Sequence, residues 1–304
     1  MLRFSRENTG ALAKWWRNID KQILFLFTFL FLLGLFFSFS STSLIVAEKM
    51  NQETYFFFFR HLTFVSISLT LLFLISLQEK NKLLKFLPIL FFISIVFLAL
   101  VPLIGTEVKG SKRWLDLYFL PRFQPVELIK PLFIIYIAKI IAADEKKSIY
   151  IRYLYSFLIL FFIILLLINQ PDLGQTLLLM FVWLTMIFVS GFNMGFLIFL
   201  TLIFLSIISF LIFMFPSKFG YIFLRIKTFL NPKTGDNFQS QKALESIKEG
   251  GLTGKGMGEG VLKDKVPEAH TDYIIAIIAE EFGAIFVLFI IIIFLYISYK
   301  ILDK

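Results

Sequence analysis

The part of this sequence best suited to chemistry is the polar run His270-Thr271-Asp272, which lies directly before a long apolar stretch. Asp272 lies at the start of this stretch, where its carboxylate could accept a proton from a substrate hydroxyl or bind a divalent cation. The alternative interpretation is helix capping, with Thr271 at the N-cap and an acid in the first turn. The two roles are compatible, because a capping interaction keeps the carboxylate ionised.

Two adjacent carboxylates, Glu280 and Glu281, follow inside the apolar stretch. Eight residues of helix rise about 12 Å, so both lie well below the end that carries Asp272. Adjacent helical residues diverge by about 100°, which leaves Glu280 nearer the face of Asp272. Charged groups at membrane depth usually face a protein interior, and a buried ion pair of Glu280 with Lys130 or Arg60 is the structural alternative. We therefore expect the two glutamates to support the site rather than to contact a substrate.

The composition indicates what must position these residues. Hydrophobic residues make up 58% of the 304 residues, phenylalanine alone occurs 41 times, and the mean hydropathy is +0.84. These values are far above those of soluble domains, and the apolar runs are continuous rather than alternating, which favours membrane-spanning helices over a β-barrel. The sequence has no cysteine, which excludes disulfides, thiolate nucleophiles, iron–sulfur clusters and zinc–thiolate sites.

We predict an all-α polytopic integral membrane protein with eight transmembrane helices, organised as one domain over 1–304. The basic tail 1–22 is expected to be cytoplasmic by the positive-inside rule, and the even number of helices then makes both termini cytoplasmic. Two external loops are predicted, at 106–124 and 216–271. The predicted helices cover about 23–47, 55–77, 84–105, 125–143, 151–169, 173–190, 196–216 and 272–299.

The external segment 216–271 is too long for a simple connection and has signals of local structure. Short helices are expected over 221–230 and 238–249, the second of them ended by Gly250-Gly251. We therefore predict an ordered cap over the end of the helix bundle. From Pro216 to His270 it carries nine Lys and Arg against six Asp and Glu, which makes this face mildly attractive to anions.

Glycines alternate with other residues over 250–260, where the sequence reads Gly-Gly-Leu-Thr-Gly-Lys-Gly-Met-Gly-Glu-Gly. Backbone amides around Gly254 and Gly256, together with the intervening lysine, are able to wrap a phosphate. The spacing is not that of a P-loop and no strand precedes it. A flexible loop is the default interpretation.

Two further charged motifs lie around the loop 106–124. Lys112-Arg113-Trp114 is typical of an interfacial anchor, and the alternative is a clamp for a pyrophosphate. Glu127 and Lys130, in the first turns of the following helix, are spaced to pair with each other. For this pair a structural role is favoured over catalysis.

Five motifs follow one another from about the third predicted helix to the end of the sequence. They are Gly110-Ser-Lys-Arg-Trp-Leu-Asp-Leu117, Phe123-Gln-Pro-Val-Glu-Leu-Ile-Lys130, Asn169-Gln-Pro-Asp-Leu-Gly174, the glycine run 250–260, and Pro267-Glu-Ala-His-Thr-Asp-Tyr273 with Ala279-Glu-Glu-Phe-Gly283. In this order they resemble the motifs of the SEDS family (FtsW/RodA/SpoVE). The version of the last motif, preceded by Gly-Met-Gly-Glu-Gly, is more similar to the cell-division branch (FtsW) than to the elongation branch (RodA).

The resemblance implies a peptidoglycan glycosyltransferase that polymerises lipid II into glycan strands at the outer face of the cytoplasmic membrane, at the division septum. It implies Asp272 as the catalytic base and as a possible ligand of Mg²⁺ or Mn²⁺. The implied partners are lipid II, the nascent glycan strand, a class B penicillin-binding protein and other divisome membrane proteins, and no nucleic acid is expected. The implied substrate-binding residues are Lys112, Arg113, Trp114, Glu127, Lys130, Gln170, His270 and Thr271. The implied supporting residues are Glu280, Glu281, Gly254 and Gly256.

One departure from the family pattern is the number of helices, since family members carry ten spans and this sequence is expected to lack the last two. Three alternative functions stay open: a flippase for lipid-linked precursors, an elongation-type (RodA) polymerase, and another polyprenyl-pyrophosphate glycosyltransferase such as an O-antigen ligase. A transporter is expected to place its charged residues near the membrane midplane on broken helices. Here the polar residues gather at one face, which favours surface chemistry.

Overall fold

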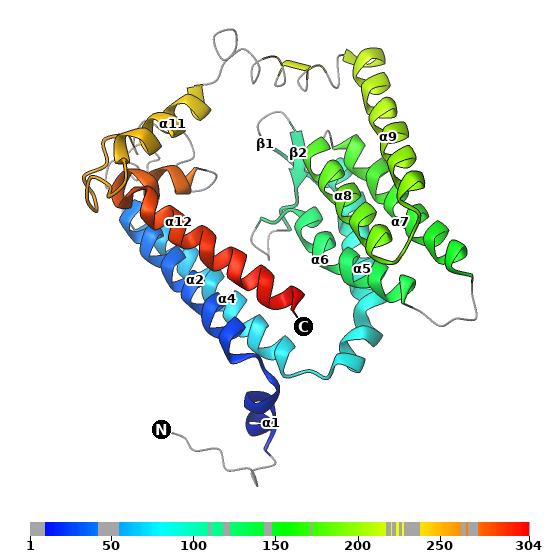
Figure 1. Ribbon diagram of the computed structural model, residues 1–304, viewed down its shortest axis with the longest axis horizontal. Coiled ribbons are helices and arrows are strands. Elements are labelled where there is room, and N and C mark those ends of the chain that lie inside the picture. The colour runs from blue at the N-terminus through cyan, green and yellow to red at the C-terminus, as the bar shows by residue number, and fades with distance from the viewer. Residues whose placement is uncertain are drawn as a thin grey trace. The chain divides into compact units, whose positions relative to one another are not determined.

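The computed structural model describes residues 10–41, 55–108, 111–117, 122–142, 148–170, 172–216, 220, 223–224, 227, 238–262, 266 and 273–303. The described chain is mainly helical, with one two-stranded antiparallel sheet among the described residues (Figure 1). It divides into two compact units, one formed by Met1–Glu79 with Pro232–Lys304 and the other by Lys80–Asn231. The single domain expected from the sequence stays a prediction.

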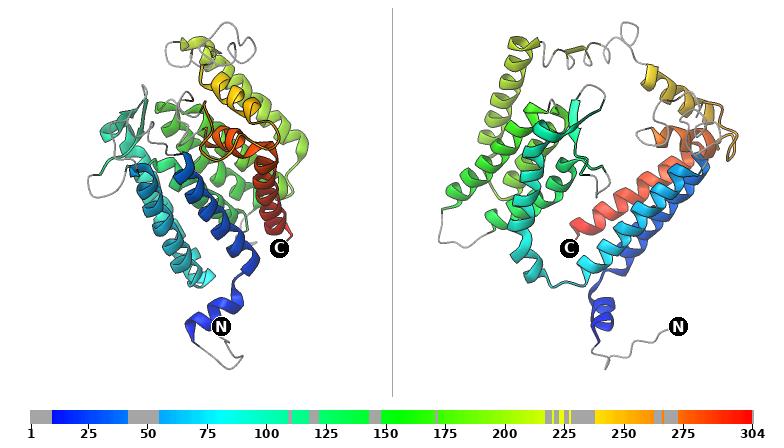
Figure 2. Two further views of the ribbon diagram at one scale, coloured as in Figure 1. Left: turned by 90° about the vertical axis from the view of Figure 1, so that its left-hand side faces the viewer. Right: turned by 180° about the vertical axis from the view of Figure 1, so that it is seen from behind.

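The first unit joins the two ends of the chain. In it, α2 packs against both α4 and α12, and α11 lies along α12 (Figure 2). Aromatic rings fill the contact of α2 with α12, where the ring centroid of Phe37 lies 5.4 Å from that of Phe282 and 5.5 Å from that of Phe286. The elements of this unit are α1 (Ala11–Asn18), α2 (Lys21–Ser41), α4 (Phe56–Ser76), α11 (Phe238–Gly250) and α12 (Ile274–Leu302).

Helix α1 is short, amphipathic and rich in tryptophan, as the sequence of the basic tail suggests. Trp15 Nε1 donates a hydrogen bond of 2.8 Å to Ser76 Oγ at the end of α4, and its ring meets Phe73 edge-on at 5.0 Å. The Lys21 ammonium lies 5.3 Å from the ring centroid of Trp16. This arrangement is typical of a segment that lies in the membrane interface, where tryptophan and basic residues are favoured.

The second unit is a bundle built around α5 to α8. Its best-buried side chains, including Leu98, Ile129, Phe133 and Leu167, are fully enclosed between these helices. A hairpin of β1 and β2 follows α5 and leads toward α6, so it lies at the same end of the bundle as the α7–α8 turn. The elements are α5 (Lys80–Ile104), β1 (Thr106–Val108), β2 (Ser111–Trp114), α6 (Pro125–Ile141), α7 (Ile149–Asn169), α8 (Leu173–Val189) and α9 (Met194–Met214).

Within the described ranges, six helices are long and apolar enough to cross a membrane: α2, α4, α5, α7, α9 and α12. Helix α8 is a shorter apolar helix, and α6 has 17 residues. Large hydrophobic side chains are exposed along all of them, as expected of surfaces that face lipid tails. The mostly helical membrane fold expected from the sequence is therefore confirmed.

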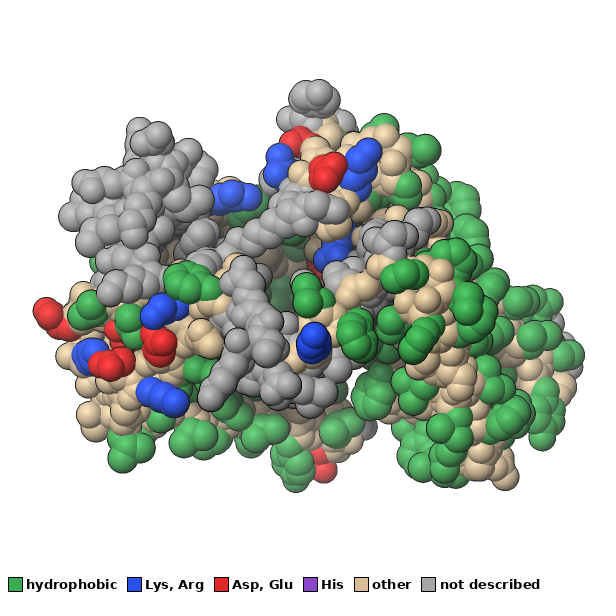
Figure 3. All heavy atoms as spheres, turned by 90° about the horizontal axis from the view of Figure 1, so that it is seen from above, with side chains coloured by type: hydrophobic (Ala, Val, Ile, Leu, Met, Phe, Trp, Pro, Cys, Tyr) green, Lys and Arg blue, Asp and Glu red, His purple; other side chains and the backbone are tan. Residues whose placement is uncertain are grey.

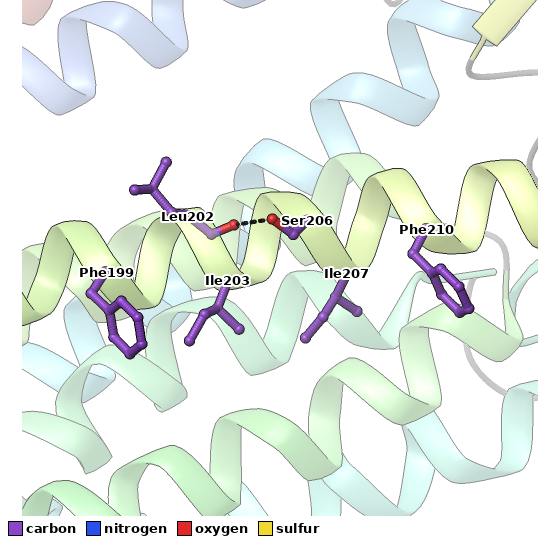
Figure 4. Close-up of a pocket in the computed structure, with 6 residues that line it drawn as sticks. All are labelled: Phe199, Leu202, Ile203, Ser206, Ile207 and Phe210. Atoms are coloured by element: carbon purple, nitrogen blue, oxygen red, sulfur yellow. Dashed lines mark hydrogen bonds between the residues drawn. The ribbon is translucent and has the colours of Figure 1, made fainter.

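Helix α9 is an example of a helix with exposed hydrophobic side chains of this kind. A shallow groove of about 580 Å³ on it is lined only by residues of α9, among them Phe199, Ile203 and Phe210 (Figure 4). The hydroxyl of Ser206 donates to the carbonyl of Leu202 at 2.8 Å, so its polarity is satisfied within the helix. An open apolar groove of this kind is what neighbouring acyl chains would fill.

The positions of the helices agree closely with the sequence analysis. Pro125 opens α6 at its first turn, as expected, and α11 ends at Gly250. The helix expected over 221–230 falls largely outside the described residues. The β1–β2 hairpin was not expected within the loop 106–124.

Candidate functional site

Each unit contains a group of polar residues that the sequence marks for function, and the first group surrounds Asp172 in the second unit. Asp172 is the N-cap of α8, and its Oδ1 accepts from the backbone N–H of Gln175 at 3.4 Å. The residue is only 6% exposed, which makes it one of the few buried acids of the described chain. A buried carboxylate requires compensating donors.

Those donors come from three separate elements. Arg113 Nε of β2 lies 3.7 Å from Asp172 Oδ2 and also donates to the carbonyl of Gln170 at 3.4 Å. Gln124 Nε2, just before α6, donates to the same Oδ2 at 3.4 Å. The buried side chain of Gln170 in turn donates from Nε2 to the carbonyl of Leu98 in α5 at 3.0 Å. Asp172 thus holds the hairpin, α6 and the α7–α8 turn together.

The predicted pair of Glu127 and Lys130 is present on α6, with Lys130 Nζ 2.6 Å from Glu127 Oε2. The other oxygen, Glu127 Oε1, accepts from Gln175 Nε2 at 3.4 Å, which links this pair to the Asp172 group. Four candidates from the sequence therefore contact one another or Asp172: Arg113, Glu127, Lys130 and Gln170. Trp114 follows Arg113 in β2, and its carbonyl accepts from Thr106 Oγ1 at 3.4 Å.

Lys112 and Arg113 are consecutive residues of β2, and successive side chains of a strand point to opposite faces. Lys112 is exposed, whereas Arg113 is half-buried against Asp172. This geometry does not bring the two side chains together as one clamp. Their role in binding an anion stays a prediction, in which Arg113 would have to exchange its carboxylate partner for a phosphate.

We expect Asp172→Ala to lower the free energy of unfolding by about 2 kcal/mol, because it removes the α8 cap, the hydrogen bond from Gln124 and the ion pair with Arg113 from a buried site. Asp172→Asn is the matched control, since its amide oxygen can replace Oδ1 as the cap of α8 and its NH₂ can donate to Gln124 once the amide of Gln124 is turned over. Asp172→Asn should lower the free energy of unfolding by less than half as much as Asp172→Ala. Unfolding in mixed micelles, followed by tryptophan fluorescence, measures the difference, and equal losses in the two variants would contradict the proposed cap.

The second group lies in the first unit, where α12 is interrupted. Gly283 has φ 82° and ψ 171°, so the helix consists of two pieces, 274–282 and 284–302. An interruption leaves carbonyls free at the end of the first piece and amides free at the start of the second. In an apolar helix these groups need partners from elsewhere in the protein.

The glycine-rich loop after α11 supplies those partners. The amides of Lys255 and Gly256 donate to the carbonyls of Glu280 and Glu281, at 2.9 and 3.0 Å. In the other direction, the amides of residues 284 and 285 donate to the carbonyls of residues 251 and 252, at 2.9 and 3.3 Å. The loop is thus hydrogen-bonded to both pieces of α12. We call this set of backbone hydrogen bonds the α12 clasp.

Close backbone approach explains three of the glycines. A Cβ at Gly250 would lie 1.9 Å from the carbonyl oxygen of Ala279, and one at Gly254 would lie 2.3 Å from that of Glu281. A Cβ at Gly283 would lie 2.2 Å from the carbonyl oxygen of Leu252. Gly254 and Gly283 also have positive φ, which disfavours any other residue.

Glu280 joins the clasp through its side chain and is fully buried. Its Oε1 accepts from the amides of Val261 and Leu262 at 2.7 and 2.9 Å, and its Oε2 accepts from Ser246 Oγ of α11 at 2.8 Å. Glu281 is also buried, with 2% exposure. The carboxylate of Glu280 therefore connects α11, the glycine-rich loop and α12.

Two alternatives that the sequence left open are wrong here. The amides of Lys255 and Gly256, which could have formed part of a phosphate cradle, are occupied by carbonyls of α12. The carboxylate of Glu280 is bonded to backbone amides and a serine, not paired with Lys130 or Arg60 as the structural alternative supposed. Instead, Lys130 is bound to Glu127 and the Arg60 guanidinium lies 5.9 Å from the ring of Phe64.

The predicted cap of the last helix is also wrong. Helix α12 begins at Ile274 with Tyr273 as its N-cap, no side chain forms the cap, and no acid lies in the first turn. His270, Thr271 and Asp272 themselves lie outside the described residues, so their predicted roles remain predictions.

On the face shown in Figure 3, some Lys and Arg side chains lie beside Asp or Glu side chains and others stand apart from them. Two ion pairs of the first unit are Lys242 with Glu245 and Lys255 with Glu249. In the described part of the chain, no group of three or more His, Asp or Glu side chains is placed to hold a metal ion.

Four residues of these two groups were not predicted from the sequence: Gln124, Asp172, Gln175 and Ser246. A polar residue directly before an apolar helix was the available signal for Asp172.

Acidification should weaken the contact of the glycine-rich loop with α11. The hydrogen bond from Lys255, 2.6 Å long, and its charge lower the pKa of Glu249 below its ordinary value. Because the pKa is lowered on folding, the stabilisation is present above the ordinary pKa and is lost as the pH falls through the lowered value. Hydrogen exchange at residues 254–256 should therefore speed up at acidic pH relative to neutral pH, after correction for intrinsic rates. Glu249→Gln should lack this extra acceleration, and an identical pH response in both proteins would contradict the assignment.

Comparison with known proteins agrees with this architecture. The model of the FtsW/RodA/SpoVE family of cell cycle proteins matches residues 21–303, nearly the whole chain. The chain belongs to this family. An FtsW of Haemophilus ducreyi, named a probable peptidoglycan glycosyltransferase, is 34% identical over 265 residues, which are 85% of this chain and 65% of that protein. An FtsW of Caulobacter vibrioides with the same name is 30% identical over 93% of this chain and 71% of that protein.

Solved structures of FtsW/RodA/SpoVE-type folds are similar as well. A chain of a peptidoglycan synthase complex superimposes with a TM-score of 0.70 at 21% identity, over 93% of this chain and 77% of that one. A variant of the rod shape determining protein RodA of Thermus thermophilus gives a TM-score of 0.61 at 21% identity, over 93% of this chain and 74% of that one. At this identity the likeness establishes the fold. The chain spans about two thirds of the length of its FtsW relatives.

Proposed function

We propose that this protein is a peptidoglycan glycosyltransferase that polymerises lipid II during septal wall synthesis. The observation that carries the proposal is the identity of 30–34% to proteins named peptidoglycan glycosyltransferase FtsW over most of the chain. Those FtsW names also favour the division branch over the elongation branch. The candidate base Asp272 lies in a motif of the kind expected for this activity.

In the proposed reaction, Asp272 accepts the proton of the acceptor sugar's 4-hydroxyl as its oxygen attacks the anomeric carbon of the donor. The bond from that carbon to the pyrophosphate breaks, and undecaprenyl pyrophosphate leaves with the bonding electrons. A single displacement inverts the anomeric carbon. The leaving group gains negative charge, which Lys112, Arg113 and Lys130 are proposed to stabilise. His270, Thr271, Trp114, Glu127 and Gln170 are proposed to orient the substrate.

The proposed topology has eight membrane helices with both termini cytoplasmic and the reaction at the outer face. Helices α6 and α8, with 17 residues each, are about 25 Å long, close to the thickness of the hydrocarbon core. One end of the first unit carries Lys14, Arg17, Lys21 and Lys300, as the cytoplasmic ends of membrane helices usually do. The α12 clasp belongs to the opposite end of α12.

The proposed partner is a class B penicillin-binding protein, within the set of divisome membrane proteins. A structural neighbour that belongs to a complex coordinating polymerization and crosslinking supports this choice. A divalent cation is also proposed, bound to the substrate's pyrophosphate near Asp272. Activity measured with Mg²⁺, with Mn²⁺ and with EDTA tests the cation.

A lipid-linked precursor transporter is the second candidate, and the broken helix α12 is the observation that favours it. Broken helices of transporters use their free backbone groups to bind ions or substrate. In α12 the carbonyls of Glu280 and Glu281 and the amides of residues 284 and 285 are already bonded to the glycine-rich loop. The break is therefore closed by the protein itself, which favours the glycosyltransferase.

The test is to supply purified lipid II to the protein reconstituted with its transpeptidase partner and to separate the products by gel electrophoresis. Glycan polymer is expected. The same preparation in vesicles, with a probe for lipid II on each leaflet, measures transport. Transport without polymer would overturn the glycosyltransferase in favour of the flippase.

A further inference from the structure

The observation behind a further inference is how the chain leading to Asp272 is attached to α12. Leu262 is fixed by the bond from its amide to Glu280 Oε1 at 2.9 Å. Val266 is buried and packs against Ile277, with Tyr273 beside it. The chain then rejoins α12 at Tyr273, its N-cap.

These attachments fix the two described residues, Val266 and Tyr273, that flank the segment 267–272. Tyr273 and Glu280 are seven residues apart, about 10 Å along the first piece of α12. Between the anchored Val266 and Tyr273 lie only the six residues 267–272, which include Asp272. Both ends of this connection are fixed on one short helical piece. The carbonyl of Leu262 accepts from the amide of Val266 at 3.0 Å. A change at Glu280, which holds the amide of Leu262, therefore acts through Leu262 on the position at which the connection begins.

We propose that Glu280 is a positioning residue of the glycosyltransferase: its carboxylate fixes the start of the connection that carries Asp272. The inference rests on the proposed function. In this role Glu280 acts as an acceptor of hydrogen bonds, from two amides and one hydroxyl, and not as a base, an acid or a ligand of the substrate.

The burial and partners of Glu280 support this role. The carboxylate is 0% exposed, and three donors, the amides of Val261 and Leu262 and the hydroxyl of Ser246, surround it. A group with its acceptor sites filled by its own protein is poorly placed to take a proton from substrate. Gly260 lies against it as well, since a Cβ there would be 3.2 Å from the carboxyl carbon. The pocket is shaped around this carboxylate.

Glu280→Gln separates the two possibilities. The glutamine oxygen can accept from both amides, and its NH₂ can donate to Ser246 Oγ, so the attachment survives while the charge and the basicity are lost. Glu280→Ala removes all three acceptors and leaves two amides unsatisfied. Ser246→Ala removes only the hydroxyl, and Glu259→Ala, an exposed carboxylate of the same loop, is the matched control.

The experiment measures lipid II polymerisation by the full chain with its transpeptidase partner, normalised to folded protein from size-exclusion chromatography. Glu280→Ala is expected to lower kcat by about 10²-fold, as a displaced reacting group does, while KM changes less than about threefold. Glu280→Gln and Glu259→Ala should stay within about threefold of the wild type. Ser246→Ala should fall between the two glutamate variants. A merely structural role would lower the yield of folded protein without this selective fall in kcat.

Two results would overturn the proposal. If Glu280→Gln loses as much activity as Glu280→Ala, the charge acts directly in the reaction. If folded Glu280→Ala keeps wild-type kcat, Glu280 positions nothing.

Failure of the proposed function is recognised separately, because the wild type and Glu259→Ala would then both make no polymer. In that event the positioning role in this reaction also fails. Hydrogen exchange at residues 261–262 still tests the attachment. Faster exchange in Glu280→Ala but not in Glu280→Gln would retain it, and unchanged exchange in both would reject it.

Discussion

Asp272→Ala is expected to lower the rate of lipid II polymerisation by about 10²–10⁴-fold, the usual contribution of a general base. The loss should appear mainly in kcat, because the carboxylate acts on the proton that leaves in the transition state. Asp272→Asn should be equally inactive, since an amide cannot accept that proton. The measurement is the initial rate of polymer formation by the protein with its transpeptidase partner.

The control for this prediction is Glu259→Ala, which removes an exposed carboxylate from the glycine-rich loop. Its rate should match the wild type. Unfolding curves of the Asp272 variants should also match the wild type, because Tyr273, rather than residue 272, is the N-cap of α12. Polymer formed at the wild-type rate by Asp272→Ala would contradict its role as the base.

The second large effect concerns stability. Gly283→Ala is expected to lower the free energy of unfolding by about 3–5 kcal/mol. About 1–2 kcal/mol of this comes from the positive φ of 82°, which disfavours any residue with a Cβ. The rest comes from overlap, because the new Cβ would lie 2.2 Å from the carbonyl oxygen of Leu252 and 2.5 Å from the amide nitrogen of Gly254. Neither backbone atom is able to move away without breaking the α12 clasp.

Gly258→Ala is the matched control, because Gly258 has nearly the same φ, 84°, but nothing within 4 Å of its Cβ position. Gly258→Ala should lower the free energy of unfolding by only about 1–2 kcal/mol, which is the contribution of backbone strain alone. Unfolding of each variant in mixed micelles gives the two values. Equal losses at Gly283 and Gly258 would show that the close approach to the loop has no effect on stability.

Much of the fold was predictable because a bilayer demands long apolar helices whose backbone is satisfied within each segment. The position of α4, α7 and α8 followed from hydropathy alone, and the end of α11 followed from Gly250-Gly251. The β1–β2 hairpin was missed, since two strands of three and four residues leave no periodic pattern. The break at Gly283 was missed because one glycine inside an apolar helix is usually tolerated without interruption.

The candidate site was predictable only where its contacts are local. The pair of Glu127 and Lys130 followed from a spacing of three residues on a helix. The partners of Glu280 lie 18, 19 and 34 residues away, and two of them are backbone amides, which carry no signal in the residue type. The alternating glycines were noticed, but a glycine that closely approaches a carbonyl looks the same in sequence as one that cradles a phosphate.

The first unit combines helices that precede the second unit in the sequence with helices that follow it, and this has a consequence for biosynthesis. Helices α2 and α4 are made before α5 to α9, whereas α12, which covers Phe37, is made after them. The glycine-rich loop also leaves the ribosome before the carbonyls that it must bind. Until α12 is inserted, the aromatic face of α2 has only lipid or a chaperone as a neighbour, and the loop amides have only water. Insertion of α12 is thus the step that completes both structures at once.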